Sequence, residues 1–138
     1  MNFNRYYFLY VEDDPLSREV MQVIMEHVMD VDHLTLFEDS LNFGQRLAKL
    51  AEKPDLILLD IHMLPIDGFA MLKLIRAHPS YRDTKVIALT ASVTNSEIAQ
   101  LRSSGFNGAI SKPLQLTNFP TMIERILNGE SVWTVNDD

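Results

Sequence analysis

Cysteine is absent from this chain of 138 residues. Its absence excludes disulfide scaffolds, thiol nucleophiles and cysteine zinc sites, and it is compatible with a cytosolic protein. Long hydrophobic runs are lacking too: no apolar stretch approaches the ~20 residues of a membrane-spanning helix, and the first residues lack the charged and apolar regions of a signal peptide. We therefore expect a cytoplasmic location and no membrane partner.

Positive charge is scarce, with 12 Lys and Arg against 19 Asp and Glu and a formal net charge of -7. The basic residues are also scattered, so we expect no direct binding to nucleic acid. Internal repeats, low-complexity segments and interdomain linkers are lacking as well. The length and the hydrophobic share of 46% are typical of one globular domain. We place this domain at residues 1–129, followed by a short C-terminal tail at 130–138 and no output domain.

Short apolar runs alternate with amphipathic stretches along the chain. Five runs of four to six residues predict buried strands, at Tyr6–Val11, His33–Phe37, Asp55–Leu59, Lys85–Thr90 and Gly108–Ser111. Strands that are apolar throughout and alternate with helices indicate a parallel sheet covered on both faces. The predicted fold is therefore α/β: a doubly wound, flavodoxin-like (βα)5 domain with five parallel strands in the order 2-1-3-4-5.

Helical periodicity and end signals predict the elements between these strands. The apolar residues expected on the first three helices are Leu16, Val20, Val23, Ile24 and Val28, then Leu41, Leu47 and Leu50, then Phe69, Leu72 and Ile75. Asp67-Gly68 is expected to open the third helix, and Thr94 with Glu97 matches a capping box for the fourth. The last helix is expected to begin near Asn118 and to end at Gly129.

Polar side chains follow the strands whose carboxyl ends meet in this topology. Strand order 2-1-3-4-5 places the ends of strands one and three side by side, which is where such folds carry their chemistry. The residues at the strand ends are Glu12, Asp13 and Asp14 after strand one, Asp60 after strand three, Thr90 at the end of strand four and Lys112 after strand five. Asp60 terminates the most apolar run. Burying a carboxylate there costs free energy, so packing alone does not explain its presence.

Converging carboxylates repel one another by ~4 kcal/mol per close pair at an effective dielectric constant of 20, and a divalent cation relieves that repulsion. Oxygen ligands favour Mg²⁺, with Mn²⁺ as the other choice, and such a pocket suits metal-assisted phosphoryl transfer to a carboxylate. Asp60 is then the candidate nucleophile. Lys112 offers a positive charge and Thr90 a hydroxyl, the groups that hold phosphoryl oxygens.

Four segments, YFLYVEDDP, ILLDIHMLPIDG, VIALTA and ISKP, occur in this order within Tyr6–Leu127. With them the chain resembles a response-regulator receiver domain of bacterial two-component signalling, of the stand-alone, chemotaxis-regulator-like kind. The resemblance implies that Asp60 is the phosphorylated aspartate and that Glu12 and Asp13 form the acidic pair around the metal. It also implies that the backbone carbonyl of His62 is a third protein ligand, Thr90 is the switch hydroxyl and Lys112 contacts the phosphoryl group. It further implies a cis peptide bond between Lys112 and Pro113.

The implied function is a receiver that accepts a phosphoryl group on Asp60 from a histidine kinase or histidine phosphotransfer protein in a Mg²⁺-dependent reaction. It would catalyse only its own phosphorylation and dephosphorylation, and would signal by a conformational change to a protein partner that the sequence does not identify. Two alternatives stay open. One is a Mg²⁺-dependent phosphohydrolase of the haloacid dehalogenase type, which needs a second Asp where His62 stands. The other is a receiver fold used only for binding.

Two positions depart from the family pattern. Leu64 stands where proline is usual, with Pro65 following, and Ala109 stands where the family has an aromatic residue three places before Lys112. Signalling through rotation of an aromatic ring on the fifth strand is therefore not expected, and the loop after Thr90 and the start of the fourth helix are the predicted route. In the tail, the apolar pair Val132 and Trp133 is expected to pack against the domain.

Overall fold

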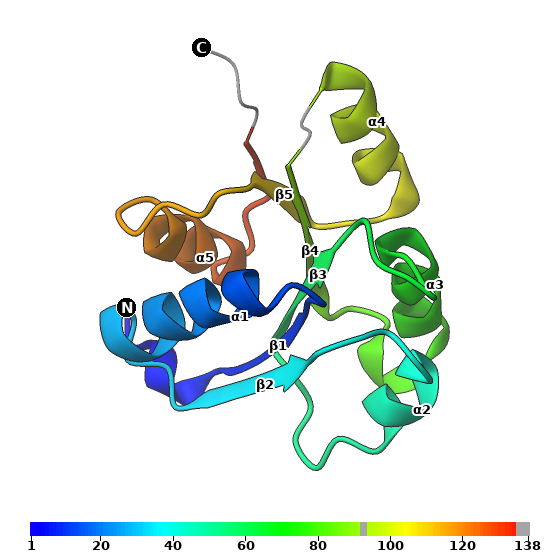
Figure 1. Cartoon of the computed structure of the whole chain (residues 1–138), viewed down its shortest axis with the longest axis horizontal. Coiled ribbons are helices and arrows are strands. Elements are labelled where there is room, and N and C mark those ends of the chain that lie inside the picture. Colours follow the sequence, from blue (N-terminus) through cyan, green and yellow to red (C-terminus); the bar gives the residue numbers. More distant parts are fainter. Residues whose placement is uncertain (92–93, 135–138) are drawn as a thin grey trace.

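A single parallel sheet forms the centre of the computed structural model, which describes residues 1–91 and 94–134 (Figure 1). Its strands are β1 (Tyr7–Val11), β2 (His33–Phe37), β3 (Leu56–Asp60), β4 (Lys85–Thr90), β5 (Gly108–Ser111) and β6 (Val132–Trp133). Their order is β2-β1-β3-β4-β5-β6, and every neighbouring pair is parallel. The predicted fold and the order of the first five strands are confirmed. The sixth strand is an addition at the β5 edge, in the segment that the sequence placed in a tail.

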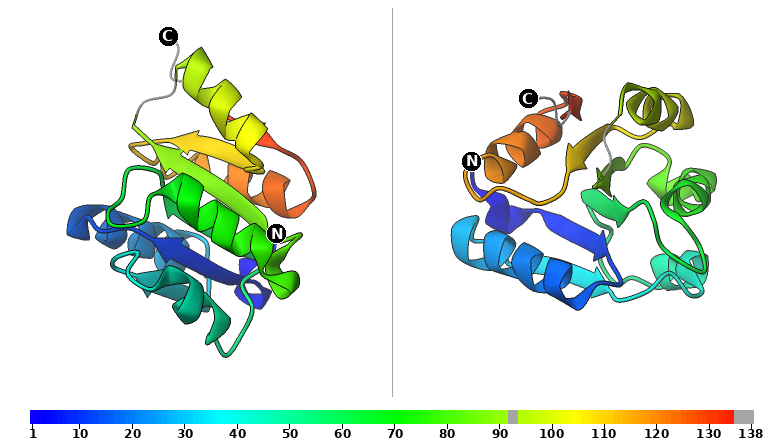
Figure 2. Two further views of the ribbon diagram at one scale, coloured as in Figure 1. Left: turned by 90° about the vertical axis from the view of Figure 1, so that its right-hand side faces the viewer. Right: turned by 45° about the horizontal axis from the view of Figure 1, so that its top comes forward.

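Helices cover both faces of the sheet (Figures 1 and 2). On one face lie α1 (Pro15–Gln22), which continues into a π-helical segment at Val23–Val28, and α5 (Phe119–Leu127). On the other lie α2 (Phe43–Ala48), α3 (Gly68–Ala77) and α4 (Asn95–Ser104). Short 3₁₀ turns occupy Phe3–Arg5 and Pro79–Tyr81. Among the described residues, no helix combines the length and apolarity needed to cross a bilayer.

The sheet divides the interior into two hydrophobic cores. Successive residues of a strand point to opposite faces, so in β3 Leu56 and Leu58 pack on the side of α1 and α5, whereas Ile57 and Leu59 pack on the side of α2, α3 and α4. All four side chains are fully buried. This two-sided burial is the reason that the central strands read as continuous apolar runs.

The buried face of α1 differs from the expected one. Leu16, Val20, Val23 and Val28 are exposed. The core is instead contacted by Met21 of α1 and by Ile24 and Met25 of the π-helical segment that continues it. Only Ile24 of the expected set is buried, because the segment carries two apolar stripes and periodicity alone does not choose between them. In the second helix Leu47 is buried whereas Leu41 lies before the helix and is exposed; in the third, Leu72 and Ile75 are buried as expected.

The predicted helix ends agree with the observed caps. The Asp67 carboxylate accepts a hydrogen bond from the Ala70 N–H at 2.9 Å at the start of α3. The Thr94 hydroxyl accepts one from the Glu97 N–H at 3.1 Å at the start of α4. Asn118 is the N-cap residue of α5, and Gly129 follows this helix with a φ of 98°, in the left-handed region that favours glycine. These local signals set where the loops carrying the site begin and end.

Candidate functional site

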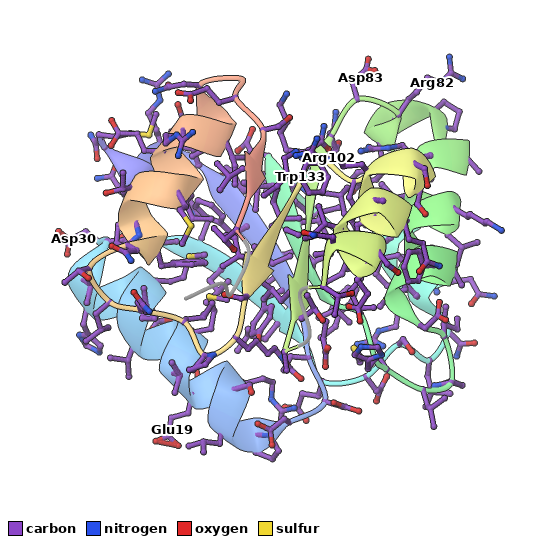
Figure 3. All side chains as sticks on the ribbon, turned by 90° about the horizontal axis from the view of Figure 1, so that it is seen from above. Glu19, Asp30, Arg82, Asp83, Arg102 and Trp133 are labelled. Atoms are coloured by element: carbon purple, nitrogen blue, oxygen red, sulfur yellow. The ribbon has the colours of Figure 1, made fainter. Side chains whose placement is uncertain are left out.

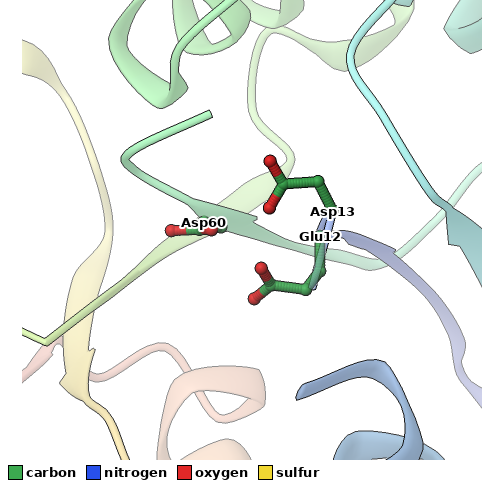
Figure 4. A group of neighbouring side chains, drawn as sticks. All are labelled: Glu12, Asp13 and Asp60. Atoms are coloured by element: carbon green, nitrogen blue, oxygen red, sulfur yellow. The ribbon is translucent and has the colours of Figure 1, made fainter. Parts of the chain in front are cut away.

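Three carboxylates gather where β1 and β3 end (Figure 4). The two strands pair in register, with Val11 opposite Leu59. Glu12 and Asp13 follow β1 directly, and Asp60 is the last residue of β3. One carboxylate oxygen from each residue lies within 4.8 Å of those from the other two. The convergence predicted from strand order is therefore present in the structure.

These three carboxylates differ in exposure. Glu12 is fully buried, Asp60 is 8% exposed and Asp13 is open to solvent. Burial raises the pKa of Glu12 above its usual value, and the nearby Asp60 carboxylate raises it further. Hydrogen bonds from Lys112 and Tyr10 act in the opposite direction on the same pKa. Glu12 is thus a carboxylate whose negative charge depends on its polar partners.

Lys112 supplies the countercharge. Its Nζ lies 2.7 Å from Oε1 of Glu12 and 3.6 Å from Oδ2 of Asp60, and its side chain is largely buried. Lys112 directly follows β5, two strands away from β3, so only the folded sheet brings it to Asp60. The ammonium is the positive group that the sequence analysis expected at this position.

Tyr10 is a site residue that the sequence analysis missed. Its buried hydroxyl donates a hydrogen bond to Oε1 of Glu12 at 2.8 Å, the same oxygen that accepts from Lys112. Burial and the Glu12 charge raise the pKa of Tyr10 well above its usual value, so the phenol stays a donor. The signal was available, since Tyr10 and Glu12 are two residues apart and therefore project to the same face at the end of β1.

Asp14, the third acidic residue after β1, has a different task. Its carboxylate accepts hydrogen bonds from the backbone N–H of Ser17 at 2.9 Å and from the Ser17 hydroxyl at 2.7 Å. These bonds lower the pKa of Asp14. Asp14 is therefore the N-cap of α1 and lies outside the three-carboxylate group.

Thr90 is the last residue of β4 and is buried. Its hydroxyl lies 3.4 Å from Oε1 of Glu97, in the first turn of α4, and donates to that carboxylate. The sequence predicts Glu97 as part of the α4 cap and of the helix surface expected to recognise a partner, and the bond to Thr90 adds a contact to the strand end. The contact joins the strand end beside Asp60 to the following helix, along the route on which the signal is expected to travel.

The loop after Asp60 folds closely around it. The backbone N–H of His62 donates to Oδ1 of Asp60 at 3.2 Å, and the His62 side chain is exposed. Gly68 permits this fold: a Cβ there would lie 2.8 Å from Cδ1 and 2.9 Å from Cα of Ile61. The peptide bonds Leu64-Pro65 and Lys112-Pro113 are both cis, the second as expected.

The donor set fits a hard divalent cation. Glu12, Asp13 and Asp60 offer oxygen atoms only, in a group compact enough to share one ion. Carboxylate oxygens are the ligands that Mg²⁺ and Mn²⁺ prefer. The four histidines of the chain contribute no side chain to this group.

Comparison with known proteins places these features in a family. The model of the response regulator receiver domain matches residues 8–124. The osmosensing histidine protein kinase SLN1 of Saccharomyces cerevisiae is 27% identical over 117 residues, which are 83% of this chain and 10% of that protein. The probable C4-dicarboxylate response regulator DctR of Halalkalibacterium halodurans is 34% identical over 106 residues, 76% of this chain and 44% of that protein. The chain thus spans less than half the length of these two relatives.

Solved structures share the fold. One is the receiver domain of the sensor histidine kinase PA1611 from Pseudomonas aeruginosa, whose structure has a magnesium ion coordinated in the active-site cleft. Its TM-score is 0.77 at 23% sequence identity, and the match covers 90% of this chain and 98% of that one. The signal receiver domain of a histidine kinase from Syntrophus aciditrophicus has a TM-score of 0.74 at 25% identity, with 96% and 99% covered.

Proposed function

Because this chain belongs to the response regulator receiver family, we propose that its Asp60 accepts a phosphoryl group from a histidine kinase or a histidine phosphotransfer protein. Receiver domains of two-component response regulators are phosphorylated on Asp by histidine kinases, and they are signalling domains, not conventional enzymes. The observation that carries the choice of Asp60 is its place at the end of a buried strand, within reach of two other carboxylates and 3.6 Å from the Lys112 ammonium.

In the proposed reaction a carboxylate oxygen of Asp60 attacks the phosphorus of a phosphohistidine. The bond between phosphorus and the histidine nitrogen breaks, and the electron pair stays on the donor imidazole. Mg²⁺, held by Asp13 and Asp60 with the His62 carbonyl and with Glu12 in its outer shell, would neutralise charge on the transferred phosphoryl oxygens.

Lys112 and Thr90 would hold the new phosphoryl group. The Lys112 ammonium, which contacts Glu12 and lies near Asp60, would turn toward a phosphoryl oxygen, because a phosphoryl group on Asp60 adds negative charge beside the ammonium and offers it a charge-assisted hydrogen bond. Thr90 would donate its hydroxyl to a second oxygen and leave Glu97. The start of α4 then changes its contacts, which we propose as the signal read by a downstream protein partner.

The two alternative functions lack support from a specific observation. The chain has His62 where a haloacid-dehalogenase-type phosphohydrolase needs a second aspartate. A binding module without phosphorylation would have no use for a buried Glu12 and Asp60 beside an ammonium, since burying these charges costs free energy.

Acetyl phosphate with Mg²⁺, followed by mass mapping of the modified residue, tests the proposal. We expect one phosphoryl group per chain on Asp60, none on the Asp60→Asn variant and none in excess chelator. Asp32→Asn, an exposed aspartate just before β2, is the matched control and should be labelled like the wild type. Phosphate on another residue, or labelling that survives Asp60→Asn or chelation, would contradict the proposal.

A further inference from the structure

The edge of the sheet beside β5 is covered by the chain's own residues Val132–Thr134, which we name the C-terminal clasp. Within it, β6 pairs in parallel with β5, with Val132 opposite Gly108 and Trp133 opposite Ala109. Thr134 adds a second attachment. Its N–H and hydroxyl donate to the Ala109 carbonyl at 3.0 and 3.2 Å, and its hydroxyl oxygen accepts from the Ser111 N–H at 3.0 Å.

The clasp also contacts α4. The Arg102 guanidinium, on α4, lies 5.0 Å from the centre of the Trp133 ring, and Figure 3 shows the two side chains next to each other. The indole is partly buried against the core on the side of α2, α3 and α4, whereas Val132 is buried in the core on the opposite side. The clasp therefore joins β5, α4 and both cores.

Gly108 allows the backbone of the clasp to pack closely against β5, because it has no side chain. A Cβ atom at Gly108 would lie 2.5 Å from the carbonyl oxygen of Val132 and 3.1 Å from Cδ1 of Ile87. Real Cβ atoms do not approach a backbone oxygen so closely, so any side chain at Gly108 would push the clasp outward. The clasp is thus packed on β5 with backbone against backbone.

Both elements under the clasp also reach the candidate site. On β5, Ser111 bonds to Thr134 and directly precedes Lys112, whose ammonium lies near Asp60. On α4, Glu97 accepts from Thr90 one to two turns before Arg102 contacts the indole. A change at Asp60 that moves Lys112 and Thr90 would therefore act on both elements that the clasp contacts, β5 and α4.

We propose that the clasp is an intramolecular cover whose docking is coupled to the state of Asp60: it is docked in the unphosphorylated protein and released on phosphorylation, which uncovers the β5 edge. This inference rests on the proposed function of Asp60. Release is the expected direction because β6 has two residues and few hydrogen bonds. When β5 and α4 change their positions, we therefore expect β6 to separate from β5 before larger elements separate. Coupling of this kind is reciprocal, so removal of the clasp must favour the phosphorylated state.

Trp133 is the only tryptophan of the chain, so the emission of the full-length protein reports on the clasp. Beryllofluoride with Mg²⁺ is the probe for the phosphorylated state. We expect it to shift the emission to longer wavelength and to increase quenching by acrylamide, since the indole gains water contact. Asp60→Asn should show neither change.

Two variants test the reciprocal effect. Gly108→Ala keeps the indole but displaces its strand, so its emission should be red-shifted before any addition, and its affinity for beryllofluoride should rise about fivefold or more. Thr134→Val removes the hydroxyl bonds and should act in the same direction if Gly108→Ala fails to fold. Gly44→Ala is the matched control, because its Cβ would meet only Leu74 side-chain atoms at 3.9 Å.

The two hypotheses fail in different ways. If calorimetry detects no Asp60-dependent binding of beryllofluoride, the proposed function is wrong and the coupling falls with it. If beryllofluoride binds through Asp60 while Trp133 emission stays constant or shifts to shorter wavelength, the coupling is wrong and the phosphoacceptor role stands. Displacement of the clasp by Gly108→Ala without any change in beryllofluoride affinity would equally refute the coupling.

Discussion

Tyr10→Phe is the most informative single change in this protein, because it removes one hydroxyl and keeps the ring. The lost hydrogen bond is buried, measures 2.8 Å and ends on the Glu12 carboxylate. Hydrogen bonds to charged groups contribute about 1.5–3 kcal/mol, against about 0.5–1.5 for neutral pairs. Glu12 keeps its bonds to Lys112 and to the Asp14 N–H. We therefore expect the free energy of unfolding at neutral pH to fall by about 1.5–2 kcal/mol.

The effect should depend on pH with a defined sign. Burial raises the pKa of Glu12 above its ordinary value of 4.5, so the folded protein binds more protons than the unfolded chain. The contribution of Glu12 to stability is therefore full below about pH 4.5 and is lost as the pH rises through the folded pKa. Without the Tyr10 hydroxyl that pKa rises further, so the variant loses more stability at neutral pH than at acidic pH.

Urea unfolding between pH 4 and 7 measures this difference, with Tyr81→Phe as the matched control. Tyr81 is also buried, but its hydroxyl donates to the neutral Leu47 carbonyl at 3.3 Å, so its removal should cost about half as much. A double-mutant cycle of Tyr10→Phe with Glu12→Gln should give a coupling energy of about 1 kcal/mol. Equal losses in the two tyrosine variants, or a Tyr10→Phe loss that does not change with pH, would refute the reasoning.

Three further changes have defined outcomes. Lys112→Met should tighten Mg²⁺ binding about tenfold by calorimetry, since the ammonium competes with the ion for the same carboxylates. The same variant should lose most labelling by acetyl phosphate, because no ammonium is left to hold the phosphoryl group. Weaker Mg²⁺ binding would contradict this. Gly68→Ala should lower the unfolding free energy by about 1–3 kcal/mol in urea, because its Cβ would meet Ile61, and Gly44→Ala should not. Arg76→Met should cost at least about 2 kcal/mol, since this partly buried guanidinium donates to four backbone carbonyls and one amide oxygen; full stability by thermal unfolding would disprove that role.

The sequence by itself determined the strand order and the place of the carboxylates. Strands buried on both faces are visible as continuous apolar runs, and parallel topology then places the ends of β1 and β3 together. Asp60, Glu12 and Asp13 therefore meet where the pattern predicted, and local signals such as Asp67 and Thr94 marked the helix ends correctly. Each of these features depends on a few neighbouring residues or on a rule that holds for the whole fold class.

The tertiary structure alone decided three other features. The face of α1 that packs on the sheet depends on the position of the helix, because both of its apolar stripes satisfy the same period. The sequence spacing places Tyr10 and Glu12 on one face, but only the fold brings the Lys112 ammonium from β5 to the same Glu12 oxygen that accepts from the Tyr10 hydroxyl. The pairing of Trp133 with Ala109 depends on where α5 returns the chain, since a two-residue strand carries no periodicity of its own and its partner is distant in sequence.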